Sequence, residues 1–252
     1  EPYRRQRQMC IRDRNKTEEL QRIIAGRDKL YSVIAHDLRS PMGSIKMVLN
    51  MLMLNLPVEK IGGEMYELLT MANRTTEDVF SLLDNLLKWT KSQIGNLNVV
   101  YQDVDAVEVV DSVIDVFNMV AGLKKITIRE EKPEKLPVCT DIDMLKTIIR
   151  NLLSNAIKFS NENSEVLVKM EEQGDTVVVS VKDSGCGIDE EGQKKLLHTD
   201  THFSTFGTNN EEGSGLGLLL CQDFAVKSGG KLWFTSKKGE GSTFYFSIPL
   251  KK

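Results

Sequence analysis

The sequence predicts two successive structural units, an antiparallel helical hairpin and then an α/β sandwich with a mixed sheet. Two observations support this fold class. Up to about residue 96, apolar residues recur in the three- and four-residue steps of helices that pack together. After residue 97, short runs with the alternation of strands are interleaved with helical segments, a mixture that is typical of an α/β sandwich.

The composition is that of an ordinary globular chain. It has 252 residues, of which 40% are hydrophobic and 27% charged, enough for one large or two small domains. A formal net charge of −3 gives no reason to expect nucleic acid as a partner. The four cysteines are scattered without a Cys-x-x-Cys pair, so we expect reduced thiols in a cytoplasmic protein. Any membrane attachment is expected to come only from upstream segments, because no apolar run here could cross a bilayer.

The N-terminal part is predicted to form the hairpin. Residues 1–15 are polar and basic without a clear period, and are interpreted as a linker or as foreign sequence. Helices are expected over Lys16–Leu56 and from about Glu64 to Ile94. Two long helices bury little surface alone, so residues 16–96 are predicted to form a four-helix bundle as a homodimer. The second helix keeps an unbroken heptad rhythm at Met65, Leu68, Ala72, Thr75, Val79, Leu82, Leu86 and Trp89.

The remaining residues, 97–252, are predicted to form the sandwich. Helices are expected at Ala106–Gly122, Asp141–Phe159 and Gly215–Ser228, with a short one from Asp189. The last two strands are expected to pair as a hairpin. The expected strands are Asn98–Val104, Ile126–Glu130, Leu136–Thr140, Glu165–Glu171, Thr176–Asp183, Lys231–Ser236 and Ser242–Leu250.

A histidine with polar neighbours lies within the first helical segment, in the sequence Ala35-His36-Asp37-Leu38-Arg39-Ser40-Pro41. Neutral imidazole is well suited to nucleophilic attack near neutral pH. Ser40 lies one helical turn beyond His36 on the same face. A histidine on a helix surface usually has no catalytic role, so its significance depends on the motifs downstream.

Polar side chains share one face of the helix expected at Asp141–Phe159. Asn151, Asn155 and Lys158 are spaced four and three residues apart. Amide oxygens are suitable ligands for Mg²⁺, and a lysine suits phosphate. An ordinary solvated face would also carry such residues.

Two glycine motifs follow. Asp183-Ser184-Gly185-Cys186-Gly187 comes directly after a strand, where a carboxylate can accept a hydrogen bond from an exocyclic amine such as that of adenine. Glu212-Gly213-Ser214-Gly215-Leu216-Gly217 opens a helix, whose N-terminal amides can bind phosphates. Each motif alone is also compatible with an ordinary turn, but the order and structural contexts of all three are jointly specific.

Together with the histidine sequence, these motifs resemble the transmitter core of sensor histidine kinases of bacterial two-component systems, over roughly Lys16 to Leu250. The resemblance implies a dimerisation and histidine phosphotransfer hairpin at residues 16–96 and an ATP-binding catalytic domain at residues 97–252. It implies ATP with Mg²⁺, autophosphorylation, and transfer to a response-regulator receiver domain.

The resemblance also implies roles for residues of the second unit. By that family's pattern Asn155 would ligate Mg²⁺, Asn151 and Lys158 would reach the phosphates, and Asp183 would hold the adenine. Thr243 would touch the base through water. The loops would be shaped by Gly185, Gly187, Gly213, Gly215 and Gly217.

The same pattern implies a mobile lid over Thr199–Glu212 with Phe203 as its aromatic anchor. His36 would attack the γ-phosphate while Asp37 takes or holds the proton on the other ring nitrogen. Ser40 stands where many such kinases carry a threonine or asparagine that positions water for dephosphorylating the regulator. Because serine lacks the methyl group that restrains a threonine rotamer, we expect weak phosphatase activity.

Two alternatives from other classes remain. One is an ATPase of the same nucleotide-binding fold, which needs no nucleophile such as His36 on a helix. The other is a catalytically silent dimeric scaffold that binds a response regulator, which needs neither Asn155 nor Asp183.

Overall fold

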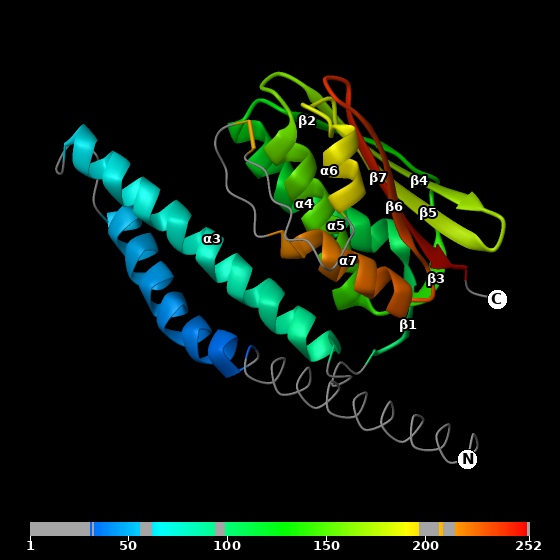
Figure 1. Cartoon of the computed structure of the whole chain (residues 1–252), viewed down its shortest axis with the longest axis horizontal. Coiled ribbons are helices and arrows are strands. Elements are labelled where there is room, and N and C mark those ends of the chain that lie inside the picture. The colour runs from blue at the N-terminus through cyan, green and yellow to red at the C-terminus, as the bar shows by residue number, and fades with distance from the viewer. Residues whose placement is uncertain are drawn as a thin grey trace, which may run out of the picture. The chain divides into compact units, whose positions relative to one another are not determined.

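The structure is a computed structural model that describes residues 31, 33–55, 62–93, 99–196, 207–208 and 215–250. The chain divides into two compact units, Glu1–Leu97 and Asn98–Lys252 (Figure 1). Each unit is described by itself below. No helix within the described ranges is both long enough and apolar enough to cross a bilayer.

The described part of the first unit is a helical hairpin, as the sequence predicts. Residues 33–55 form one helix and α3 (Gly63–Gln93) forms the other. Arg39 forms an ion pair with Asp84, and Lys46 Nζ lies 3.4 Å from the carboxylate of Glu77. The residue number rises on one helix as it falls on the other, so the helices are antiparallel. The part of the expected first helix upstream of residue 31 lies outside the described residues.

A small apolar cluster joins the two helices of the hairpin. Ala35, Leu83 and Leu87 are buried, with Met42 and Leu86 packed against them. Most other apolar side chains of the hairpin are exposed. A single hairpin therefore covers only a small part of its apolar surface.

The second unit contains a five-stranded mixed sheet with the strand order β2-β4-β5-β7-β6. β2 and β4 are parallel, and the other neighbours are antiparallel, including the predicted β6–β7 hairpin. The strands are β2 (Thr127–Glu131), β4 (Glu165–Gln173), β5 (Thr176–Lys182), β6 (Leu232–Lys237) and β7 (Gly241–Pro249).

The two remaining strands do not join this sheet. β1 (Gln102–Asp105) and β3 (Pro137–Thr140) pair antiparallel as a separate two-stranded sheet. A single bridge between Val138 and Leu250 connects this pair to the chain beyond β7. The expectation of one sheet therefore holds for the five central strands but not for β1 and β3.

The helices of the second unit are α4 (Ala106–Leu123), α5 (Ile142–Phe159), α6 (Glu190–Lys195) and α7 (Leu216–Lys227). Of these, α4, α5 and α7 lie over one face of the five-stranded sheet (Figure 1). Alternate strand residues point into this interface, because successive side chains of a strand face opposite sides. The buried strand residues of the core include Val166, Val168, Met170, Val177, Val179, Val181, Phe244, Phe246 and Ile248.

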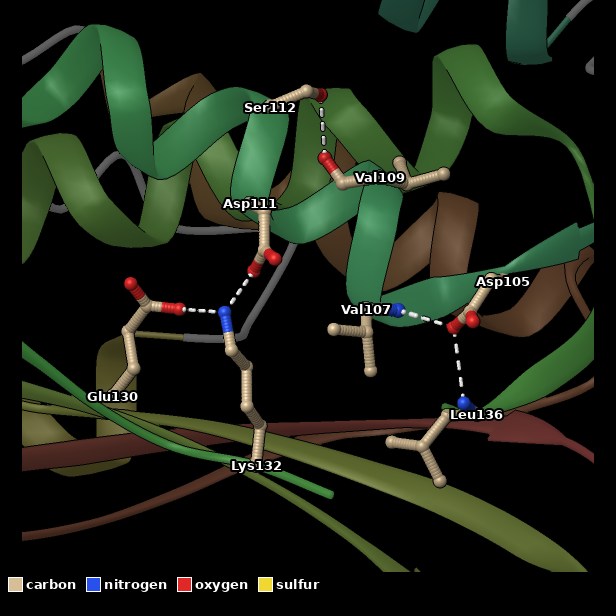
Figure 2. A network of polar contacts seen from close by, with 8 residues as sticks. All are labelled: Asp105, Val107, Val109, Asp111, Ser112, Glu130, Lys132 and Leu136. Carbon is tan, nitrogen blue, oxygen red and sulfur yellow. Dashed lines mark hydrogen bonds and ion pairs between the residues drawn. The ribbon is translucent and has the colours of Figure 1, made fainter. Parts of the chain in front are cut away.

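Aspartates directly before the helices explain where α4 and α5 begin. Asp105 Oδ1 accepts hydrogen bonds from the backbone nitrogens of Val107 (3.0 Å) and Leu136 (2.9 Å), as Figure 2 shows. Asp141 has extended backbone angles and caps α5 through the amides of Asp143 and Met144. The prediction that α5 begins at Asp141 was therefore one residue too early.

A lysine connects the second turn of α4 to the end of β2. Lys132, which follows β2, donates hydrogen bonds to Asp111 of α4 and to Glu130 of β2 (Figure 2). With Asp105, it sets the position of α4 over the sheet, and hence of α5 beside it.

Replacement of Asp105 by alanine should destabilise the second unit. The change removes a helix cap and leaves the amide of Leu136 without its acceptor, so we expect a loss of about 2 kcal/mol in the free energy of unfolding. Urea denaturation would measure this loss. Asp115→Ala, an exposed position on the same helix, is the matched control and should change stability by less than about 0.5 kcal/mol. Equal effects of the two changes would contradict the capping role.

Candidate nucleotide-binding site

The site is centred on a buried carboxylate at the end of β5. Asp183 follows Lys182, the last residue of β5, and is only 4% exposed. Its Oδ1 accepts hydrogen bonds from the backbone nitrogens of Gly185 (2.9 Å) and Ser242 (3.2 Å). Its own backbone nitrogen donates to the carbonyl of Ser242 (2.8 Å). The carboxylate is therefore fixed between β5 and the start of β7.

Burial raises the pKa of Asp183, because desolvation disfavours the charged form more than the backbone hydrogen bonds from Gly185 and Ser242 favour it. Both of these bonds are made by Oδ1, so Oδ2 can accept a hydrogen bond from a ligand. A buried carboxylate held in this way is suited to a ligand that brings an N–H donor, such as an exocyclic amine.

The glycines beside Asp183 allow backbone segments to pack closely. A Cβ on Gly185 would lie 2.1 Å from the carbonyl oxygen of Phe159, the last residue of α5. Gly187 has a φ of +61°, and a Cβ there would lie 2.0 Å from the carbonyl oxygen of Lys237. The loop after Asp183 is thus held between the end of α5 and the end of β6.

The polar face of α5 lies as the sequence predicts. Asn151, Asn155 and Lys158 are half-buried, whereas Ile149, Leu152 and Ala156 are buried in the core. Asn151 Nδ2 donates a hydrogen bond to the carbonyl of Thr147 at 2.9 Å. The Lys158 ammonium lies 4.9 Å from the ring centroid of Phe159.

The third motif meets the first at the beginning of α7. Gly215 precedes this helix with left-handed backbone angles, and Gly217 lies in its first turn. A Cβ on Gly217 would lie 2.6 Å from the side-chain oxygen of Asn151. The structure therefore brings α5 into contact both with the loop after Asp183 and with the glycine motif of α7. Gly213 and Phe203 lie outside the described residues.

Ser242 belongs to this site, although the sequence motifs did not predict a role for it. It is buried, bonds to Asp183 through its backbone, and its hydroxyl lies 2.9 Å from that of Ser236. Thr243 comes next on β7 and therefore points to the opposite face of the sheet from the Ser242 hydroxyl. The contact of Thr243 with the base through water stays a prediction. The hydroxyl on the core side belongs to Ser242, in the same Gly241-Ser242-Thr243-Phe244 sequence.

Asn155 is the residue of this site that could hold Mg²⁺. No group of three or more histidine, cysteine, aspartate or glutamate side chains is gathered within the described ranges. Mg²⁺ in nucleotide enzymes is commonly bound by one or two protein oxygens together with the substrate phosphates. A half-buried amide oxygen on the Asn151 face of α5 fits that requirement.

The histidine sequence lies in the other unit, on an exposed helix face. The His36 side chain is 78% exposed, and its Nδ1 lies 3.2 Å from Asp37 Oδ1. A proton on Nδ1 would be donated to this carboxylate, leaving the Nε2 lone pair exposed for attack. Ser40 is exposed one turn beyond, and its carbonyl accepts a hydrogen bond from the Ser44 hydroxyl.

Comparison with known proteins identifies the family. Residues 140–252 match the family described as histidine kinase-, DNA gyrase B- and HSP90-like ATPase. The chain is 30% identical over 241 residues to the adaptive-response sensory kinase SasA of Prochlorococcus marinus, covering 94% of this chain and 61% of that protein. It is 34% identical over 229 residues to the sensor protein KdpD of Clostridium acetobutylicum, covering 88% of this chain and 25% of that protein.

Solved structures agree with this assignment. The catalytic domain of histidine kinase ThkA superposes with a TM-score of 0.53 at 30% identity, covering 60% of this chain and 96% of that domain. Full-length ShkA in complex with AMPPNP shares the fold, with a TM-score of 0.68 at 21% identity, covering 89% of this chain and 46% of that one. The chain belongs to the sensor histidine kinase family. It spans 62% of the SasA relative from Crocosphaera subtropica.

Gly187→Ala should destabilise the second unit much more than Gly174→Ala. The two glycines have nearly equal φ angles, +61° and +62°, but a Cβ on Gly174 would meet nothing within 4 Å. The left-handed backbone alone should cost about 1 kcal/mol in the free energy of unfolding at Gly174. At Gly187 the contact with the Lys237 carbonyl should bring the total to about 3 kcal/mol. Urea denaturation of both variants would test this, and equal losses would contradict the close packing of the loop.

Proposed function

We propose that this chain is the kinase core of a two-component sensor. It binds ATP with Mg²⁺, transfers the γ-phosphoryl group to His36, and passes it to an aspartate on a response-regulator receiver domain. The observation that carries this proposal is that α5 contacts both glycine motifs, Gly185 at Phe159 and Gly217 at Asn151. The same chain also presents an exposed histidine beside a carboxylate.

Adenine recognition would depend on Asp183. Its Oδ2 would accept a hydrogen bond from the exocyclic amino group of the base, and the ionised carboxylate would accept it more strongly than the protonated form. Gly185 lets the loop pack against the end of α5, and Gly187 lets it pack against the end of β6, so that a planar base could approach the backbone.

The phosphates would lie along the polar face of α5 and at the beginning of α7. The backbone amides that follow Gly215 and the side chains of Asn151 and Lys158 supply donors for phosphate oxygens. Asn155 would hold Mg²⁺ through its amide oxygen. When bound, the ion would offset the negative charge on the phosphates.

Phosphoryl transfer would use the exposed Nε2 of His36. A bond forms between Nε2 and the γ-phosphorus, the bond from that phosphorus to the β,γ-bridging oxygen breaks, and ADP leaves. Asp37 accepts a hydrogen bond from Nδ1–H, which keeps the proton there and stabilises the positive charge that develops on the ring. Ser40 would be available to orient water in the reverse reaction with the regulator.

The exposed apolar surface of the hairpin supports a homodimer. Such side chains repeat along both helices, and a second copy would cover them in a four-helix bundle. They include Ile34, Leu38, Ile45, Met51, Met65, Leu68, Met71, Val79 and Leu82. The names of the relatives, sensory kinases and sensor proteins, support a response regulator as the partner. The exposed His36–Asp37 pair favours a kinase over an ATPase of the same fold or a silent scaffold.

His36→Gln should abolish phosphorylation of the chain and leave nucleotide binding intact. Glutamine removes the ring nitrogen that accepts the phosphoryl group, whereas the nucleotide motifs lie in the other unit. Incubation with γ-labelled ATP should label the unaltered chain with a product that is stable to base and labile to acid, and should label the variant at least about a hundredfold less. Calorimetry with Mg-ATP serves as the control. Labelling at the unaltered rate would refute His36 as the acceptor.

Asp183→Asn should weaken ATP binding more than ITP binding. Asparagine preserves the acceptor for Gly185 and Ser242, but its amide group can place an N–H donor opposite the amino group of adenine. Hypoxanthine carries an oxygen at that position and could accept from the asparagine. We expect calorimetry to show about a tenfold rise in the Kd for ATP and a smaller change for ITP. Equal losses for the two nucleotides would make the carboxylate purely structural.

The pH dependence of the Kd for ATP, measured by the same calorimetry, tests whether the Asp183 carboxylate binds the base. The pKa of Asp183 in the nucleotide-free chain is raised, and we expect the base to bind the ionised form more tightly, because a charged acceptor makes the stronger hydrogen bond. The affinity for ATP should therefore fall as the pH is lowered through that raised pKa. This part of the pH dependence should be missing in Asp183→Asn.

A further inference from the structure

Lys124 is a buried lysine that the proposed mechanism does not use. It follows α4 directly, and its backbone nitrogen donates to the carbonyls of Ala121 and Gly122 at the end of that helix. Only 7% of the residue is exposed. Lysine is rarely buried to this extent, because removing the ammonium from water is costly unless oxygen atoms surround it.

The ammonium of Lys124 is surrounded by oxygens of two other segments. Its Nζ donates to the carbonyls of Ile157 (3.0 Å) and Lys158 (2.9 Å), and to the hydroxyl of Thr208 (2.5 Å). The two carbonyls belong to the last turn of α5, where the helix leaves acceptors unsatisfied and its dipole favours a positive charge. Lys124 thus caps α5 from outside that helix.

Thr208 is held at the same place by further bonds. Its backbone nitrogen donates to the Lys158 carbonyl at 3.1 Å. Its hydroxyl lies 2.8 Å from the Ser160 carbonyl and within 3.1 Å of the Lys158 carbonyl. Since the hydroxyl has one proton, it can accept from Lys124 while donating to one of these carbonyls. The residue lies within the stretch Thr199–Glu212 that the sequence predicts as a lid.

The same helix end is shared with the nucleotide site. The carbonyl of Phe159, the next residue after Lys158, accepts a hydrogen bond from Cys186 at 3.3 Å and packs against Gly185. The last turn of α5 is therefore in contact with the loop after Asp183 and with Thr208. Lys124 bonds to this turn and to Thr208, so its position links these segments.

We propose that Lys124 is a positioning residue for the nucleotide site. Its ammonium fixes the last turn of α5 and Thr208 in one arrangement, and that arrangement sets where Lys158 and the loop after Asp183 meet the nucleotide. The inference rests on the proposed function, because it assigns Lys124 to the ATP site proposed above.

Two variants test the link, and both are studied in the full chain. Lys124→Met keeps most of the buried stem and removes the three donors, whereas Thr208→Val removes the hydroxyl without changing charge. Each should raise the Kd for Mg-AMPPNP about tenfold in calorimetry. The double variant should lose little more than either single change, because both remove one shared contact. The melting temperature of each variant is measured without nucleotide in parallel.

Lys125→Met is the matched control. Lys125 is the neighbouring lysine, its side chain is 68% exposed, and it lies 3.5 Å from Glu162. It should leave the Kd unchanged. Lower melting temperatures in Lys124→Met and Thr208→Val with an unchanged Kd would make the contact purely structural and overturn the inference. If Lys124→Met does not fold, the Kd of Thr208→Val for Mg-AMPPNP alone tests the inference: a raised Kd supports it and an unchanged Kd overturns it. An unaltered chain that bound no Mg-AMPPNP would overturn the proposed function and this inference together.

Discussion

The hydrogen bonds of the buried Asp183 carboxylate are the interaction on which the arrangement of the site in the second unit depends. Its two hydrogen bonds to Oδ1 tie the end of β5 to Ser242 and to the loop at Gly185. Burial raises its pKa, so its contribution to folding stability is present at low pH and is lost as the pH rises through that pKa. When Asp183 is ionised in the nucleotide-free chain, its two backbone hydrogen bonds offset the cost of burying the charge only in part. A ligand that donates a hydrogen bond to the carboxylate would offset this cost.

The helix α5 contributes both to the core and to the site, because its two faces carry different side chains. One face carries apolar side chains such as Ile149 and Leu152 into the core, which fixes the rotation of the helix. That rotation places Asn151, Asn155 and Lys158 together on the other side. The end of the helix then contributes backbone carbonyls, which carry no charge of their own but bind the ammonium of Lys124 and the loop after Asp183.

Periodicity and residue type predicted the hairpin, the mixed sheet and the polar face of α5, because each depends on the alternation of apolar and polar residues. Features that depend on backbone contacts were not predictable. The acceptors of Lys124 are main-chain carbonyls, and Lys124 itself reads as an ordinary lysine after a helix. That the Ser242 hydroxyl rather than that of Thr243 lies on the core side depends on the register of β7, which local pattern does not set. The pairing of β1 with β3 away from the main sheet likewise depends on tertiary packing rather than on local pattern.

A crystal structure of the chain with Mg-AMPPNP would show whether Asp183 recognises adenine within a site built on α5. We expect the exocyclic amino group of adenine within about 3 Å of Asp183 Oδ2, with the phosphates between the polar face of α5 and the beginning of α7. A nucleotide whose base lay away from Asp183, with its amino group facing solvent, would contradict this expectation.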